Sequence, residues 1–145
     1  MKLFWAVLAT GLIAGCGDRP SYNIIGDEIR ASLSSSAGDP VRGQAIFLER
    51  DQGHCVICHQ VAGLEISFQG NVGPDLSDVG ARLTPAQLRL RIVDMSAVTP
   101  GTLMPSYFRT DHLNQVAEEF SGETILSAQQ IEDLVAYLAS LETGP

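Results

Sequence analysis

The segment HCVICHQ, residues 54–60, constrains this chain more than any other feature. Cys55 and Cys58 are three positions apart, and His59 follows directly. A CxxCH segment can form a redox dithiol, supply part of a zinc site, or attach a c-type haem. In the last case the two thiols add to the vinyl groups and the imidazole binds the iron. Features in the rest of the sequence are needed to choose among these three hypotheses.

The N-terminus predicts an exported protein. In residues 1–15 the only charged side chain is Lys2, and the apolar stretch after it is shorter than the roughly 20 residues that span a membrane. These features are typical of a signal peptide. The stretch ends in LIAGC, which resembles a lipobox and favours a lipidated Cys16 that tethers the mature chain to the membrane. Ordinary cleavage after Gly17 would remove Cys16 and stays open; both interpretations place the protein in the periplasm.

The number of cysteines favours haem. The chain has three, and Cys16 is either lipidated or removed, which leaves only the pair. A zinc site needs further ligands at a regular spacing, which His54 and His112 do not provide. A redox dithiol is expected at a strand-to-helix turn, and no strand pattern precedes the motif. The sequence therefore predicts one covalent haem c, with thioethers at Cys55 and Cys58 and with His59 as an iron ligand.

One mainly helical domain is predicted over residues 39–145, after a serine-rich arm or linker over 16–38. Asp39 can cap a first helix that starts at Pro40 and runs toward Arg50. A shorter helix is expected over residues 112–120, with Leu113 and Val116 turned inward.

Two capping boxes predict further helices. Thr84 and Gln87 open one, and Ser127 and Gln130 open another. The second carries a continuous apolar stripe: Ile131, Leu134, Val135, Leu138 and Leu141.

A CxxCH segment soon after the first helix, with an amphipathic helix at the end, resembles a class I cytochrome c. The resemblance implies a single domain wrapped round the haem, with the first and last helices crossed. Gly43 and Phe47 match the contact residues of that crossing on the first helix, and Tyr137 matches their partner on the last. It also implies that the carbonyl of Pro74 accepts a hydrogen bond from His59 and orients it.

An electron-transfer haem needs a sixth iron ligand. Met104 lies in TPGTLMPSY, a segment whose prolines and glycine hold the backbone without a helix. A proline directly after the methionine resembles the ligand loop of class I cytochromes. Met104 is therefore the expected ligand, and its neutral thioether would favour ferrous iron and raise the reduction potential. Met95 and His112 remain alternatives.

Longer segments are similar to the SoxX family, the monohaem subunits of the sulfur-oxidising SoxAX cytochromes. They include FQGNVGPDL, RLRIVD and MPSYFRT. The resemblance implies a heterodimer with a SoxA-like cytochrome that acts as an L-cysteine S-thiosulfotransferase, joining thiosulfate to a cysteine of a SoxYZ-like carrier. This chain would accept the electrons and pass them to a downstream cytochrome. With both motif cysteines alkylated, it has no thiol for sulfur chemistry.

The alternative is a free periplasmic electron shuttle without a catalytic partner. Without Lys2 the chain has eight arginines against 17 acidic residues, a net charge of −9, so a ring of docking lysines is impossible. The sequence has no stripe of basic residues that would indicate nucleic-acid binding. A smaller arginine patch near the haem is a further hypothesis: Arg82, Arg89, Arg91 and Arg109.

Overall fold

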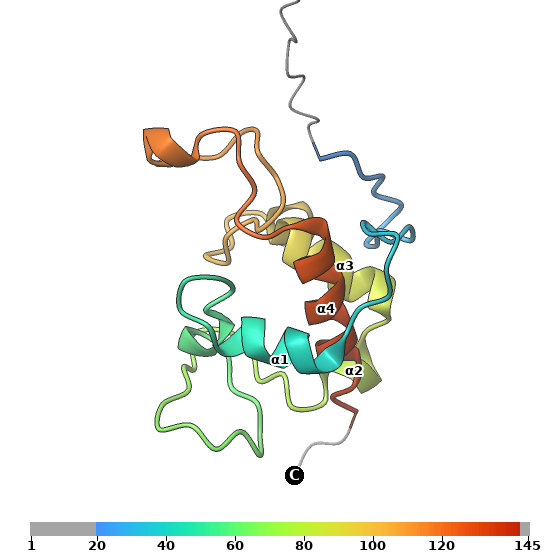
Figure 1. The fold of residues 1–145 in the computed structure, drawn as a ribbon, viewed down its shortest axis with the longest axis vertical. Helices are drawn as coiled ribbons and strands as arrows, with labels where there is room; N and C mark the ends of the chain where they lie inside the picture. Colours follow the sequence, from blue (N-terminus) through green and yellow to red (C-terminus); the bar gives the residue numbers. More distant parts are fainter. Residues whose placement is uncertain (1–19, 143–145) are drawn as a thin grey trace, which may run out of the picture.

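The computed structural model describes residues 20–142 as a set of short helices joined by long loops. The helices are α1 (Pro40–Leu48), α2 (Val79–Arg82), α3 (Pro85–Asp94) and α4 (Ala128–Ala139), with single 3-10 turns η1 (Cys55–Ile57), η2 (Met95–Ala97) and η3 (Glu118–Phe120). Among the described residues, β pairing is limited to the isolated bridge between Ile25 and Glu28. The prediction of a mainly helical domain is confirmed (Figure 1).

The first and last helices cross, as the resemblance to class I cytochromes implies (Figure 1). Gly43 lies at the crossing, where a Cβ atom would overlap the carbonyl of Asp133 and press on Tyr137. Beside it, the rings of Phe47 and Tyr137 meet edge to face with 5.6 Å between centroids. The absence of a side chain at Gly43 therefore lets the two backbones approach and brings the aromatic pair into contact.

Both predicted capping boxes form. The Thr84 hydroxyl accepts from the Gln87 N–H at 3.3 Å, and the Gln87 side chain accepts from the Thr84 N–H at 3.0 Å. Ser127 and Gln130 make the same reciprocal pair at the start of α4. The helices they open pack together through buried side chains: Leu90, Val93, Ile131 and Leu134. By contrast, α1 ends at Leu48, short of the expected Arg50.

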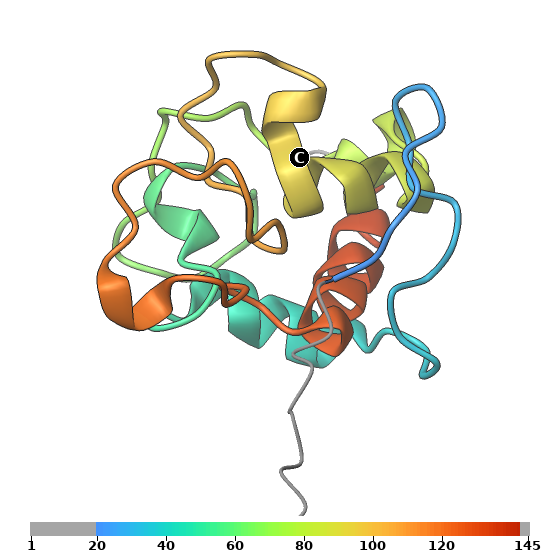
Figure 2. The same cartoon turned by 90° about the horizontal axis from the view of Figure 1, so that it is seen from above.

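The arm is extended, as expected, yet residues 20–39 are packed on the domain beside α3 and α4 (Figure 2). Ile29 is buried, and its N–H donates to the Ala86 carbonyl at 3.0 Å. Below it the Arg89 guanidinium donates to both oxygens of Glu132, at 2.7 and 2.8 Å, and to the Ile29 carbonyl at 2.7 Å. This ion pair is buried and joins arm, α3 and α4.

The prediction of a helix over residues 112–120 is wrong. His112 and Gln115 have φ of 51° and 59°, in the left-handed region that an α-helix cannot include. Only the single turn η3 forms there, and Val116 is exposed instead of turned inward. The segment leaves the domain as an excursion, the orange loop in Figure 1.

The predicted signal peptide and Cys16 lie outside the described residues. Within residues 20–142, no helix is both long and apolar enough to cross a membrane.

Candidate haem site

The three motif residues lie on one tight turn. After α1 the chain reverses at Glu49, whose carbonyl accepts from the His54 N–H at 2.9 Å. The turn η1 follows, and the Cys55 carbonyl accepts from the N–H groups of Cys58 and His59 at 3.1 and 3.0 Å. The turn gathers two thiols and an imidazole within five residues, which is the donor set that a c-type haem requires.

His59 has a fixed orientation. Its Nδ1 lies 2.8 Å from the Pro74 carbonyl oxygen, a partner that can only accept, so Nδ1 carries the proton and Nε2 keeps a free lone pair. The Pro74 contact that the resemblance implies is present. A carbonyl bonded to the far side of a ligating imidazole sets its tautomer and raises its basicity.

Gly73 supports the same ring, a role that sequence reasoning missed. A Cβ atom at this position would overlap Cε1 of His59 and lie 2.6 Å from Nδ1. The Gly73 N–H also donates to the Cys58 carbonyl at 2.8 Å, which joins the segment to the motif turn. The signal in the sequence is the pair Gly73-Pro74: one residue lets the ring lie against the backbone and the other holds it.

The thiol of Cys55 does not suit disulfide exchange. Burial raises its pKa to about 12, which its hydrogen bonds only partly offset. An exchange thiol needs the opposite, a pKa lowered toward neutrality. The redox-dithiol hypothesis therefore conflicts with the environment of this residue.

The zinc hypothesis finds no ligand set in the part of the chain that the structure describes. No group of three or more His, Cys, Asp or Glu side chains gathers there in a way that could hold an ion. Imidazole and thiol donors on one turn fit the haem instead.

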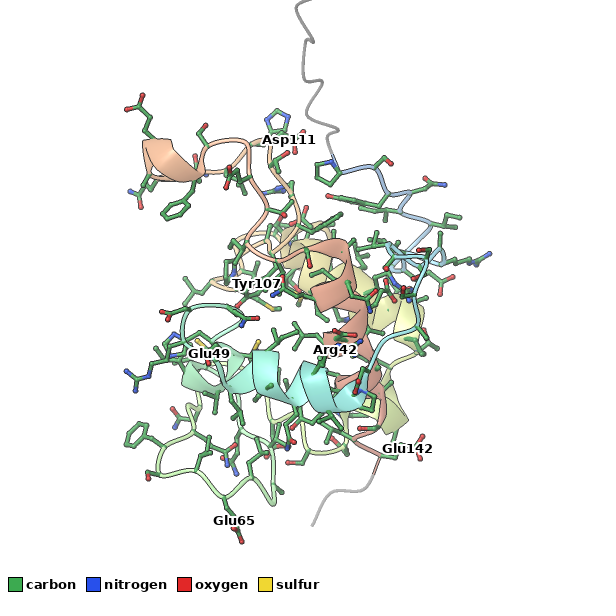
Figure 3. The ribbon with its side chains drawn as sticks, in the orientation of Figure 1. Arg42, Glu49, Glu65, Tyr107, Asp111 and Glu142 are labelled. Atoms are coloured by element: carbon green, nitrogen blue, oxygen red, sulfur yellow. The ribbon has the colours of Figure 1, made fainter. Side chains whose placement is uncertain are left out.

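The Met104 loop, residues 95–105, leads from the end of α3 to a strongly anchored segment. Tyr107 donates its N–H to the Ile92 carbonyl at 3.2 Å, and its hydroxyl donates to the Gly53 carbonyl at 2.8 Å. Burial raises the pKa of Tyr107, so the phenol stays protonated and remains a donor. In Figure 3, Tyr107 lies inside the molecule, whereas Glu65 and Asp111 project at opposite ends. Tyr107 thus joins the segment after Met104 to the segment before Cys55.

The three candidates for the sixth iron ligand differ in their surroundings. Met104 is half-buried and packs against the core. The His112 side chain is 89% exposed on the excursion, 3.9 Å from Asp111, and does not face the interior. Met95 caps the C-terminus of α3 and begins η2.

The arginine patch does not form. Each of its members is paired with a carboxylate: Arg82 with Asp78, Arg89 with Glu132, Arg91 with Asp27, and Arg109 with Asp94. Arg89 is moreover buried. The charge of each of these four guanidinium groups is therefore offset by a neighbouring carboxylate.

Comparisons with known proteins agree with this geometry. The family model described as cytochrome c matches residues 40–142. A chain in the crystal structure of SoxXA from P. pantotrophus is 35% identical, with a TM-score of 0.77, over 84% of this chain and 95% of that one. A search of curated proteins finds no match. The chain belongs to the cytochrome c family, with the class I fold and covalent haem c, and is a SoxX-like member of it.

Proposed function

We propose that this protein is the monohaem electron-transfer subunit of a periplasmic SoxAX-like complex that couples thiosulfate to a carrier cysteine. The observation that carries the proposal is the 35% identity over nearly the whole length of a SoxXA chain. The helix crossing and the His59 environment support it, because both are features that the resemblance implies.

Four residues hold the haem in this proposal. Cys55 and Cys58 would form the thioether links, and His59 and Met104 would be the protein ligands of the iron. The haem supplies one-electron chemistry, with a potential raised by the methionine. The protein's part is to orient the imidazole through Pro74 and to keep the Met104 loop in place.

Sulfur chemistry belongs to the partner. Once both motif cysteines are thioethers and Cys16 is lipidated or removed, the mature chain has no thiol. It cannot form a persulfide or a mixed disulfide. The thiol that reacts with thiosulfate must therefore lie on the SoxA-like subunit or on the SoxYZ-like carrier, and this chain passes the electrons to a downstream cytochrome.

Exposed apolar residues close to the motifs support a partner surface, which we call the apolar rim. Phe68 is 87% exposed, Leu103 next to Met104 is 88% exposed, and Ile57 and Val72 are largely exposed as well. Large apolar side chains exposed on the polypeptide favour burial against another molecule, and in this proposal the partner subunit covers them.

Affinity purification from the native periplasm tests the proposal. We expect a second haem-bearing subunit to co-purify, and thiosulfate with the carrier to reduce the haem of this chain. Isolation as a lone monomer that thiosulfate cannot reduce would overturn the proposal and favour the free shuttle.

A further inference from the structure

A single carboxylate closes the base of the Met104 loop. Asp94, the last residue of α3, is 6% exposed. Its Oδ1 accepts from the Ser96 N–H at 3.1 Å, from the Ser96 hydroxyl at 2.5 Å and from the Ser106 hydroxyl at 2.8 Å. Its Oδ2 accepts from the Arg109 guanidinium at 2.9 Å. Four donors from both sides of the loop thus converge on one side chain.

These bonds lie directly beside the expected iron ligand. Ser106 is two residues after Met104, and Arg109 also donates to the Ser96 hydroxyl at 3.0 Å. Two backbone bonds also join the segment after the loop to α3: Tyr107 donates to the Ile92 carbonyl at 3.2 Å and Phe108 donates to the Val93 carbonyl at 3.4 Å. Within the loop, the Met104 N–H donates to the Thr102 hydroxyl at 3.1 Å. Among the side chains, Asp94 is the centre of the contacts that join the two ends of the loop.

We propose that Asp94 is a positioning residue for the Met104 ligand: its buried carboxylate clamps both ends of the Met104 loop and keeps the thioether from leaving the iron. The inference rests on the proposed function, in which Met104 is the sixth ligand. Asp94→Asn replaces one of the two acceptor oxygens by an NH2 group, so either Arg109 or the serine donors lose their acceptor, and Arg109 loses its counter-charge. The loop then opens more often, although the rest of the domain keeps its contacts.

Loop opening can be measured through competition for the iron. An added ligand such as imidazole binds ferric haem only when the methionine has left. Its apparent affinity is therefore its intrinsic affinity multiplied by the fraction of open loop. A variant that opens the loop ten times more often binds imidazole ten times more tightly, whatever its activity with a partner.

Asp133 provides a matched control. It is 2% exposed, and its carboxylate accepts from the Arg42 guanidinium at 2.8 and 2.9 Å and from the Asp39 N–H at 2.8 Å. This carboxylate resembles Asp94 in burial and in its arginine partner, but it joins α1 to α4 and makes none of the contacts that close the Met104 loop. Asp133→Asn reports what a general loss of stability does to imidazole binding.

The experiment titrates imidazole into the ferric holoproteins and records the far-red charge-transfer band of iron–thioether ligation. Asp94→Asn should bind imidazole about tenfold more tightly, Ser106→Ala about threefold, and Asp133→Asn within twofold of wild type. Ser106→Ala removes one hydrogen bond and keeps the ion pair, so it serves if Asp94→Asn does not fold. Equal affinities in Asp94→Asn and Asp133→Asn, or an unchanged Ser106→Ala, would overturn the inference.

The two proposals fail in different ways. If Met104→Ala keeps the charge-transfer band, the ligand assignment is wrong. If Met104→Ala loses the band while Asp94→Asn and Ser106→Ala bind imidazole like wild type, Met104 is the ligand and only the positioning role of Asp94 is wrong.

Discussion

At the scale of single residues, the arrangement around His59 decides what the motif can do. A CxxCH segment alone permits several chemistries. The Pro74 carbonyl at 2.8 Å, with Gly73 against the ring, leaves the imidazole one free nitrogen and one orientation. Pro74 could be expected from a family resemblance. The pair Gly73-Pro74 signals a close approach to the backbone at Gly73, but only the folded chain shows that the His59 ring makes it.

Gly73→Ala should disturb the imidazole without touching the cysteines. The new methyl group would overlap Cε1 of His59, so we expect a loss of about 1–3 kcal/mol in stability and partial loss of low-spin haem. Absorption spectra and denaturant unfolding of the holoprotein measure both effects. Val72→Ala, at the exposed neighbouring position, is the control. A low-spin spectrum identical to wild type would show that the ring does not need this glycine.

Met104→Ala should retain covalent haem, because Cys55 and Cys58 are unchanged. It should lose the far-red charge-transfer band, because the methionine sulfur that gives rise to the band is gone. Haem staining of denatured protein and ferric absorption spectra check the two halves of this prediction. The double variant Cys55→Ser, Cys58→Ser is the opposite control and should show no covalently stained haem. Persistence of stain in that variant would move the attachment site elsewhere.

At the scale of elements, short sequence signals predicted the structures that depend only on neighbouring residues. The capping boxes at Thr84 and Ser127 formed because their hydrogen bonds involve residues three apart. The excursion over 112–120 could not be predicted in this way, since positive φ at His112 and Gln115 depends on loop context. The packing of the arm also depends on distant partners, as Leu33 donates to a carboxylate 99 residues away.

The ion pair between Arg89 and Glu132 should make the docking of the arm sensitive to acid. Burial by itself would raise the pKa of Glu132, but the hydrogen bonds from Arg89 and Leu33 outweigh it and hold that pKa below its usual 4.5. A lowered folded-state pKa means stability that is present above the unfolded value and is lost as the pH falls through the folded one. We therefore expect the stability to decline below about pH 4.5.

Glu132→Gln measures this contribution. The change should cost about 3 kcal/mol at pH 7, because it leaves a buried guanidinium without its counter-charge. It should also make the free energy of unfolding depend less steeply on pH between pH 7 and pH 3. Denaturant unfolding across that range is the measurement, with Asp78→Asn, from an exposed pair, as a control expected to cost under about 1 kcal/mol. Parallel pH profiles for wild type and Glu132→Gln would contradict the assignment.

At the scale of the whole molecule, the general plan of the domain could be predicted and its surface could not. The haem motif and the capping boxes follow from short patterns, whereas the crossing helices and the Pro74 carbonyl follow from the family resemblance. The expected arginine patch failed because each guanidinium is paired with an acid that lies 4 to 64 residues away in the sequence. What the surface offers near the motifs is apolar, and that became visible only with the exposures of Phe68 and Leu103.

Charge placed on the apolar rim should weaken partner binding. Phe68→Glu and Leu103→Glu put a carboxylate where we expect an apolar contact, so each should reduce affinity for the second subunit about tenfold or more. Both variants should keep the haem spectrum of wild type. Co-purification yields and binding titrations are the measurements. Val41→Glu, an equally drastic change at an exposed position of α1, should leave binding intact; equal losses in all three variants would contradict a specific surface.

The docked arm has a consequence for how far the domain can stand from a membrane. Since the chain is packed from Pro20 onward, only four peptide links separate Cys16 from the folded body. Fully stretched, they reach about 14 Å. If Cys16 carries a diacylglycerol, that short connection would hold the haem domain close to the lipid headgroups.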